Sequence, residues 1–102
     1  MSLEEEFTRA LEGTVEAAKA RNYIPTYFMQ MLGEHGGVET AKRLLASEEP
    51  QTGLFELYHR ELLHESMEAV VLREKFRPLF TEEELAEAHR RLEELGYYQK
   101  GN

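Results

Sequence analysis

The spacing most suggestive of metal chemistry is His64-Glu65-Ser66-Met67-Glu68, which reads H-E-x-x-E. On a helix, His64 and Glu68 would share one face, as metal ligands four residues apart do. A zinc-protease motif needs a second histidine where this chain has Glu68, and only His59 lies nearby as a third ligand. Glu65 and Glu68 would equally favour the positive start of a helix and leave His64 in solvent, which is the interpretation we prefer.

Other catalytic arrangements are scarce. The serines are Ser2, Ser47 and Ser66, and two of them suit helix caps. The chain has no cysteine, so it has neither a thiol nucleophile nor a zinc–thiolate site. We therefore expect no catalytic residue, no metal site and no cofactor.

Five basic residues make the best case for a nucleic-acid contact. They are Arg73, Lys75, Arg77, Arg90 and Arg91. Glutamates interleave with them, and the spacing predicts pairs of Glu87 with Arg91 and of Arg90 with Glu94. The formal net charge of −8 also opposes binding to a polyanion. Direct nucleic-acid binding is therefore not expected, although a basic patch stays open as an alternative.

Length and composition indicate one domain with one core. The chain has 102 residues, and 41% of them are hydrophobic. No apolar run approaches the roughly 20 residues that cross a bilayer, so no membrane contact is expected. The acidic start at Ser2–Glu6 differs from a basic secretory leader, which makes the cytoplasm the expected compartment.

Two capping boxes mark the outermost helices. Ser2 and Glu5 fit the S-x-x-E pattern, and the apolar spacing after them predicts a first helix over residues 3–20. Thr81 and Glu84 repeat the pattern before the last helix. No segment alternates as a strand would. The sequence therefore predicts an all-α fold, a compact single-domain bundle of about five to six short helices.

The second helix carries the predicted partner surface. Pro25 suits its first turn, and Gly36-Gly37 would end it before a short third helix. Its apolar stripe is expected to contain Ile24, Phe28, Met31 and Leu32. At about 100° per residue, Met29 points away from that stripe and Tyr27 lies on its shoulder. Both are residue types that recognition surfaces favour, so Tyr27 and Met29 are the predicted partner-binding residues.

The middle of the chain is less regular. Thr52 is expected to cap a fourth helix, and residues 59–65 would either continue that helix or form a turn. Ser66 is expected to cap a fifth helix that reaches Arg73. Because Ala69-Val70-Val71-Leu72 is apolar on every side, we expect this fifth helix to be the central one.

A series of aromatic, glycine and aliphatic positions extends over several of these helices. The main ones are Tyr23, Tyr27, Phe28, Met31, Leu32, Gly36, Gly37, Val38, Ala41, Leu44, Leu45, Gly53, Leu54, Leu57, Met67, Val70, Val71, Phe76, Phe80, Leu85, Leu92, Gly96 and Tyr97. In this pattern the chain resembles a poorly characterised bacterial all-helical module that occurs alone or appended to restriction-type and phage-related nucleases. The resemblance covers residues 22–98 of a single domain spanning 1–102 and leaves the N-terminal helix, residues 1–21, outside. It implies an accessory role and supplies no catalytic residues.

These features favour a non-catalytic accessory module that binds another protein or a second copy of itself, linked to a bacterial restriction or phage-related nuclease system. Two alternatives stay open. One is a nucleic-acid-associated accessory protein that uses the basic residues, and the other is a small metal-dependent enzyme at His59, His64 and Glu68.

Overall fold

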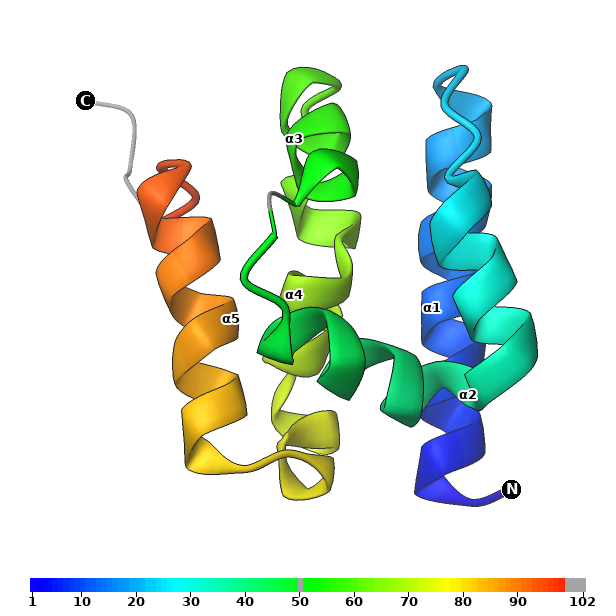
Figure 1. Cartoon of the computed structure of the whole chain (residues 1–102), viewed down its shortest axis with the longest axis vertical. Helices are drawn as coiled ribbons and strands as arrows, with labels where there is room; N and C mark the ends of the chain where they lie inside the picture. The colour runs from blue at the N-terminus through cyan, green and yellow to red at the C-terminus, as the bar shows by residue number, and fades with distance from the viewer. Residues whose placement is uncertain (50, 99–102) are drawn as a thin grey trace.

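The computed structural model describes residues 1–49 and 51–98, which are mostly helical. The elements are α1 (Leu3–Ala20), α2 (Thr26–Ala46), α3 (Thr52–His59), η1 (Leu63–Glu65), α4 (Met67–Val71), η2 (Glu74–Leu79) and α5 (Glu82–Glu94), where η denotes a 3₁₀ helix. These residues contain no strand, which confirms the predicted all-α fold (Figure 1). None of the helices is long and apolar enough to cross a membrane.

Helix α1 has the bounds that its sequence predicts. The Ser2 hydroxyl accepts a hydrogen bond from the Glu5 N–H, and the Glu5 carboxylate accepts one from the Ser2 N–H. At the other end, Asn22 adopts φ 65°, and the Tyr23 N–H donates to the Ala18 carbonyl at 3.0 Å. This is a Schellman turn, which satisfies the last carbonyl groups of the helix.

The turn between α1 and α2 corrects one predicted core position. Ile24 is 63% exposed and does not belong to the apolar stripe, because α2 begins only after Pro25. Tyr23 packs inward instead, against Ala18, Leu57 and Leu62. The other positions of the predicted stripe do face the interior: Phe28, Met31 and Leu32.

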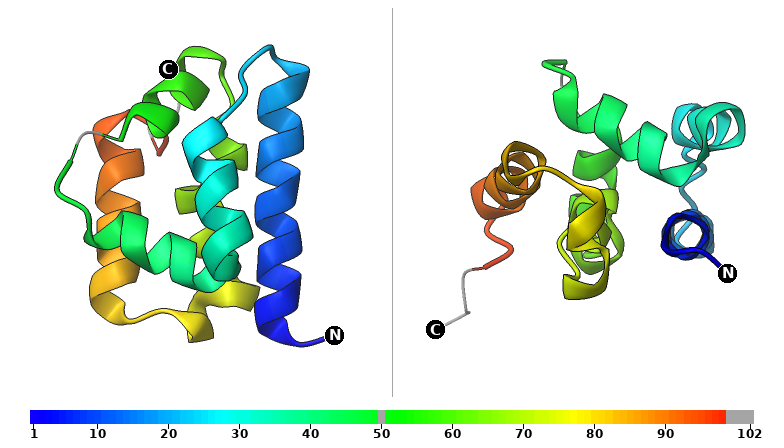
Figure 2. Two further views of the ribbon diagram at one scale, coloured as in Figure 1. Left: turned by 45° about the vertical axis from the view of Figure 1, so that its right-hand side comes forward. Right: turned by 90° about the horizontal axis from the view of Figure 1, so that it is seen from below.

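Helix α2 is broken at Gly36, where the sequence predicts a boundary between two helices. Gly36 has φ 78° and ψ 172°, which side chains with a Cβ atom rarely adopt. The first half of α2 runs beside α1, and the second half crosses the molecule toward α5 (Figure 2). Gly37 makes the closest contact with α1, because a Cβ atom there would lie 2.7 Å from Thr8 Cα. Its N–H donates to Thr8 Oγ1 at 3.0 Å.

Helix α3 begins one residue earlier than its predicted cap allows. The N-cap is Gln51, not Thr52, and it makes no side-chain capping bond. The prediction fails because Thr52 already has helical geometry as the first residue of α3. Of residues 59–65, whose structure the sequence leaves open, His59 ends α3, Glu61 adopts φ 60° in a turn, and Leu63–Glu65 form the single turn of η1.

Helix α4 is short and central. Ser66 caps it as predicted, accepting a hydrogen bond from the Ala69 N–H. The helix ends at Val71 and does not reach Arg73, because the backbone at Arg73 is extended and leads into η2. Val70 and Val71 are fully buried, which confirms that this helix lies at the centre of the fold.

The main core brings α1 against residues from the second half of the chain. Phe7 of α1 is the largest fully buried side chain. Its ring meets those of Phe76 and Phe80 edge-on, with centroid distances of 5.2 and 5.1 Å. Edge-to-face pairs of this kind add stability beyond the area they bury. Helix α1, which lies outside the region of resemblance, is therefore an integral part of the core.

Helix α5 closes the bundle with the second predicted capping box, formed by Thr81 and Glu84. Lys42 of α2 also donates to the Glu84 carboxylate at 2.7 Å, so the cap is tied to a neighbouring helix. Gly96 ends α5 with φ 79°, as expected for a glycine after the last helical turn.

Candidate binding cavity and its buried ion pair

The predicted partner-binding residues lie at one end of the bundle. Tyr27 is 68% exposed near the start of α2, whereas Met29 is half-buried. Figure 1 shows the α1–α2 turn and α3 at this same end of the molecule. Two aromatic side chains of α3 are also exposed, Phe55, which lines a hollow shared with α5, and Tyr58. We call Ile24, Tyr27, Phe55 and Tyr58 the apolar end surface.

Tyr27 borders a cavity of about 600 Å³ that is lined by residues of α1, α2, α3 and α4 and is partly open to solvent. Four of its apolar lining residues are buried: Met31, Leu54, Leu57 and Met67. Aromatic side chains contribute from α2 and the turn before it: Tyr23, Tyr27 and Phe28. A volume of this size lies within the range of roughly 300–1,000 Å³ that is typical of small-molecule sites.

Two buried polar side chains line this cavity, Thr14 from α1 and Glu68 from α4, and its more exposed lining includes the charged residues Arg43 and Glu49. Thr14 is 6% exposed, and among the described residues its Oγ1 has no hydrogen-bond partner. Thr14 follows Phe7 and Leu11 at helical spacing, which places it on the inner face of α1.

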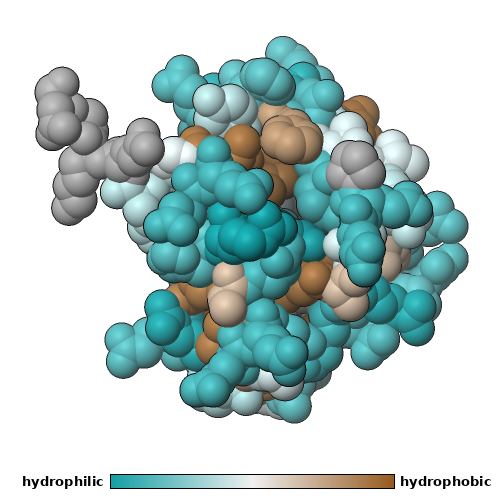
Figure 3. Space-filling model, turned by 60° about the vertical axis from the view of Figure 1, so that its left-hand side comes forward, coloured by the Kyte–Doolittle hydropathy of each residue, from teal (hydrophilic) through white to brown (hydrophobic). Residues whose placement is uncertain are grey.

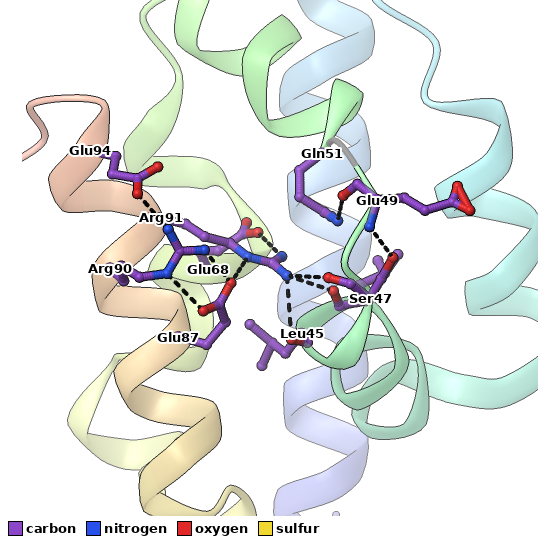
Figure 4. Close-up of polar contacts among 10 residues, drawn as sticks. Leu45, Ser47, Glu49, Gln51, Glu68, Glu87, Arg90, Arg91 and Glu94 are labelled. Atoms are coloured by element: carbon purple, nitrogen blue, oxygen red, sulfur yellow. Dashed lines mark hydrogen bonds and ion pairs between the residues drawn. The ribbon is translucent and has the colours of Figure 1, made fainter.

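Glu68 is held by a buried ion pair with Arg91 of α5 (Figure 4). Arg91 Nη1 lies 3.1 Å from Glu68 Oε2, and the two side chains are 5% and 4% exposed. Arg91 Nε also donates to Glu87 at 2.7 Å, which confirms the predicted Glu87–Arg91 pair. A buried charge is tolerated only with such partners, so Arg91 and Glu68 depend on each other.

Arg91 also completes the C-terminal end of α2. Its Nη2 group donates to the carbonyls of Leu44, Leu45 and Ser47 at 2.9, 3.3 and 3.3 Å. Carbonyls at a helix C-terminus lack partners within the helix and attract a cation. Arg91 therefore joins α2, α4 and α5 at one point beneath the segment that leads to α3.

The two carboxylates that pair with Arg91 have pKa values shifted in opposite directions. Burial raises the pKa of Glu68 above its ordinary value, and Arg91 opposes this shift only in part. Hydrogen bonds from Arg90, and then from Arg91, lower the pKa of Glu87 to about 2. Glu87 is partly exposed, so burial raises its pKa less than the two arginines lower it.

A second hollow lies on the other side of the ion pair. It has a volume of about 520 Å³, and Ser47, Glu49, Gln51 and Leu54 line both it and the first cavity. Figure 3 views the molecule from the α5 side and shows apolar atoms within a hollow of a mostly hydrophilic face. Arg90 and Glu94 line this hollow, which is more open than the cavity beside Tyr27.

The three residues of the metal-dependent alternative differ in burial and lie on three different elements. His59 ends α3 and His64 belongs to η1, and both are exposed. Glu68 follows in the separate helix α4 and is buried against Arg91. Among residues 1–49 and 51–98, no group of three or more histidines and glutamates is placed to hold a metal ion.

The five basic residues are likewise divided. Arg91 is buried, and Arg90 is paired with Glu87 and Glu94 on the outer face of α5. Lys75 in η2 pairs with Glu6, and Arg77 donates to the Leu72 carbonyl. Figure 1 places η2 at the end of the bundle where α5 starts, while Arg90 and Arg91 lie in the second half of α5.

Comparison of the chain with models of protein families, with curated proteins and with solved structures finds no match. The site must therefore be interpreted from its own geometry.

Proposed function

We propose that this chain is a non-catalytic helical module that binds another protein, or a second copy of itself, through the apolar end surface. The observation that supports this proposal most is the exposure of four large apolar side chains at one end. Ile24 and Tyr27 are 63% and 68% exposed, and Phe55 and Tyr58 are 45% and 43% exposed. Aromatic side chains are enriched in protein interfaces, where their burial supplies much of the binding energy.

The elements that carry this surface are tied together. Arg21 Nη1, at the end of α1, donates to the Arg60 carbonyl at 2.9 Å, and Arg60 Nε donates to the Arg21 carbonyl at 3.0 Å. This exchange joins the end of α1, which leads into the turn with Ile24, to the end of α3, which carries Phe55 and Tyr58. Met29 lies half-buried beside it and would contribute at its edge.

The resemblance to modules of nuclease systems suggests which partners to test first. We propose a restriction-type or phage-related nuclease encoded beside this chain, with the module acting as its accessory. The acidic surface, with a formal net charge of −8, favours a partner whose contact surface is basic.

The test is a charge placed in the centre of the surface. Tyr27→Glu should leave the fold intact, because Tyr27 is exposed, and should abolish both self-association and capture of the neighbouring nuclease. Ala86→Glu adds the same charge at an exposed position of α5 and should change neither. Sedimentation equilibrium over a concentration series measures the first and co-purification the second. Association that is equal in the wild type and in Tyr27→Glu would refute the proposal.

A further inference from the structure

Helix α3 stands apart from the main core. Among the described residues, that core draws on α1, α2, α4 and α5 and on no residue of α3. The two buried side chains of α3, Leu54 and Leu57, belong instead to two smaller clusters. Phe55 and Tyr58 of the same helix are exposed. Segments with few buried apolar contacts open at a lower free energy than the rest of a protein.

The ends of α3 add little to its stability. Its N-cap, Gln51, makes no side-chain capping bond. After its last turn, Glu61 adopts φ 60°, a left-handed conformation that is unfavourable for a residue with a Cβ atom. The helix has eight residues, and isolated helices shorter than about 12 residues are marginal in water. We therefore expect α3 to keep its hydrogen bonds only while it is packed against the other helices.

Length alone does not separate α3 from its neighbours. Helix α4 is shorter still, with five residues, but four of them are buried: Met67, Glu68, Val70 and Val71. Three of these belong to the main core. Helix α4 is thus fixed by its surroundings, whereas α3 is fixed at its margins.

Polar contacts join the end of α3 to α1. Arg60 Nε donates to the Arg21 carbonyl at 3.0 Å, and Arg21 Nη1 donates to the Arg60 carbonyl at 2.9 Å. The Arg60 guanidinium also lies 5.1 Å from the centroid of the Tyr23 ring, just after α1. These contacts exist only while α3 lies against α1.

Helix α3 also separates the cavity beside Tyr27 from the second hollow. Leu54 lines both spaces, whereas Leu57 lines the first and Phe55 the second. The buried ion pair contributes to both walls, with Glu68 in the first and Arg91 in the second. Removal of α3 would therefore take away a shared part of the two walls and join the two spaces beside the ion pair.

We propose that α3, together with the turn to Leu62, is a lid that opens as a unit while the main core stays folded, and that the exchange between Arg21 and Arg60 holds it closed. The open state admits solutes to the buried ion pair. It also divides the apolar end surface, whose residues come partly from α3 and partly from the start of α2 and the turn before it. The lid is a property of the fold and does not depend on the proposed protein contact.

Native-state hydrogen exchange, measured by NMR on the full chain, tests this proposal with two buried amides. The Leu62 N–H donates to the Leu57 carbonyl at 2.8 Å, and the Val70 N–H donates to the Ser66 carbonyl at 3.0 Å. A protection factor measures the equilibrium between the closed and the open state of each amide. In the wild type, that of Leu62 should be at least about tenfold lower than that of Val70, because exchange at Val70 requires the main core to unfold.

Two variants separate opening of the lid from unfolding of the whole chain. Phe7→Leu weakens the main core, which is intact whether the lid is open or closed. It should lower the protection factor of Val70 about tenfold and leave that of Leu62 unchanged. Arg60→Met destabilises only the closed state, so it should lower both protection factors by the same factor, about tenfold.

Arg43→Met is the matched control for Arg60→Met. Arg43 pairs with Glu39 four residues earlier in its own helix, as Arg60 pairs with Glu56. The Arg43 side chain is 54% exposed, so its loss should change neither protection factor. Arg21→Met removes one of the two hydrogen bonds of the exchange and keeps the Arg60 side chain. It should lower both factors by less than Arg60→Met does, and it serves as the test if Arg60→Met does not fold.

Two results would overturn the proposal. The first is equal protection of Leu62 and Val70 in the wild type, with an equal fall of both in Phe7→Leu, since α3 would then unfold only with the core. The second is a protection factor of Leu62 that changes in neither Arg60→Met nor Arg21→Met, since the exchange between the two arginines would then not hold the lid closed.

Discussion

Arg90 and Arg91 are neighbours on α5, share Glu87 as a partner, and occupy opposite environments. The side chain of Arg90 is 53% exposed and pairs only with glutamates of its own helix. That of Arg91 is 5% exposed, and it reaches Glu68 in α4 and three carbonyls at the end of α2. An arginine thus pairs only within its own helix on the exposed face of α5, whereas an arginine on the buried face joins α2, α4 and α5.

The physical difference is the solvent. Water screens the charges around Arg90, and exposed ion pairs of this kind contribute little to stability. The side chain of Arg91 is 5% exposed and only weakly screened by solvent, so removal of one partner leaves the other charge buried and alone. The comparison shows that the burial of an ion pair matters more for stability than the number of ion pairs.

The largest effect should follow from Arg91→Met. We expect a loss of about 3–5 kcal/mol in the free energy of unfolding, because Glu68 would be left as an unpaired buried charge. Urea denaturation followed by circular dichroism measures this loss. The double variant Arg91→Met/Glu68→Met should be more stable than Arg91→Met alone. A double variant that is less stable than Arg91→Met would show that Glu68 does not depend on Arg91.

Two glycines of α2 show the same contrast between a buried and an exposed position, Gly37 against α1 and Gly33 in open space. Gly37→Ala should cost about 1–3 kcal/mol, because its Cβ atom would lie 2.7 Å from the Thr8 backbone. Gly33 is helical with open space around it, so Gly33→Ala should stabilise the fold by about 0.5–1 kcal/mol. Thermal unfolding of both variants tests this. Equal effects of the two would mean that α1 and α2 can separate without cost.

The pH dependence of stability should differ in sign for Glu68 and Glu87, the two carboxylates that pair with Arg91. Between the ordinary pKa of 4.5 and the raised pKa of Glu68, the folded state binds more protons than the unfolded state. The contribution of Glu68 to stability should therefore grow as pH falls through this window. For Glu87 the sign is reversed, and its contribution is lost as pH falls from 4.5 toward a pKa of about 2.

Urea denaturation at a series of pH values, with Glu68→Gln and Glu87→Gln as references, measures these contributions. The stability of the wild type relative to Glu68→Gln should rise on acidification. Its stability relative to Glu87→Gln should fall. Differences of the same sign would contradict the opposed environments of the two groups.

The smallest effect should follow from Arg90→Ala. The unfolding free energy at neutral pH should fall far less than in Arg91→Met, since Arg90 contacts only side chains on the exposed face of α5. This small loss should accompany a rise in the pKa of Glu87 from about 2, because its main hydrogen-bond donor is removed. NMR titration of the glutamate side chains detects this shift, and a marked loss of stability would remove the contrast between Arg90 and Arg91.

Local signals predicted much of the fold. The capping boxes at Ser2 and Thr81 predicted where α1 and α5 begin, because each is complete within four residues. Gly36 predicted the break in α2 for the same reason. Ile24 was misplaced because the helical period was extended across Pro25 into a turn.

The candidate site was harder to predict, because its parts come together only through packing. The sequence predicted the Glu87–Arg91 pair, but it gave no sign that residues 44–47, far from Arg91 in the chain, would bury that arginine. The cavity is lined by residues from four helices and the segments between them. Thr14 and Glu68 lie beside the cavity because of packing with residues distant in the chain, which no local sequence pattern predicts.

The exchange of hydrogen bonds between Arg21 and Arg60 closes a large loop in the chain. It joins positions 39 residues apart. The conformational entropy of closing such a loop is lost when the protein folds. Most of the cavity wall, from Tyr23 to Leu57, lies within this loop. The order of the cavity wall therefore depends in part on a contact outside the cavity, at the ends of α1 and α3.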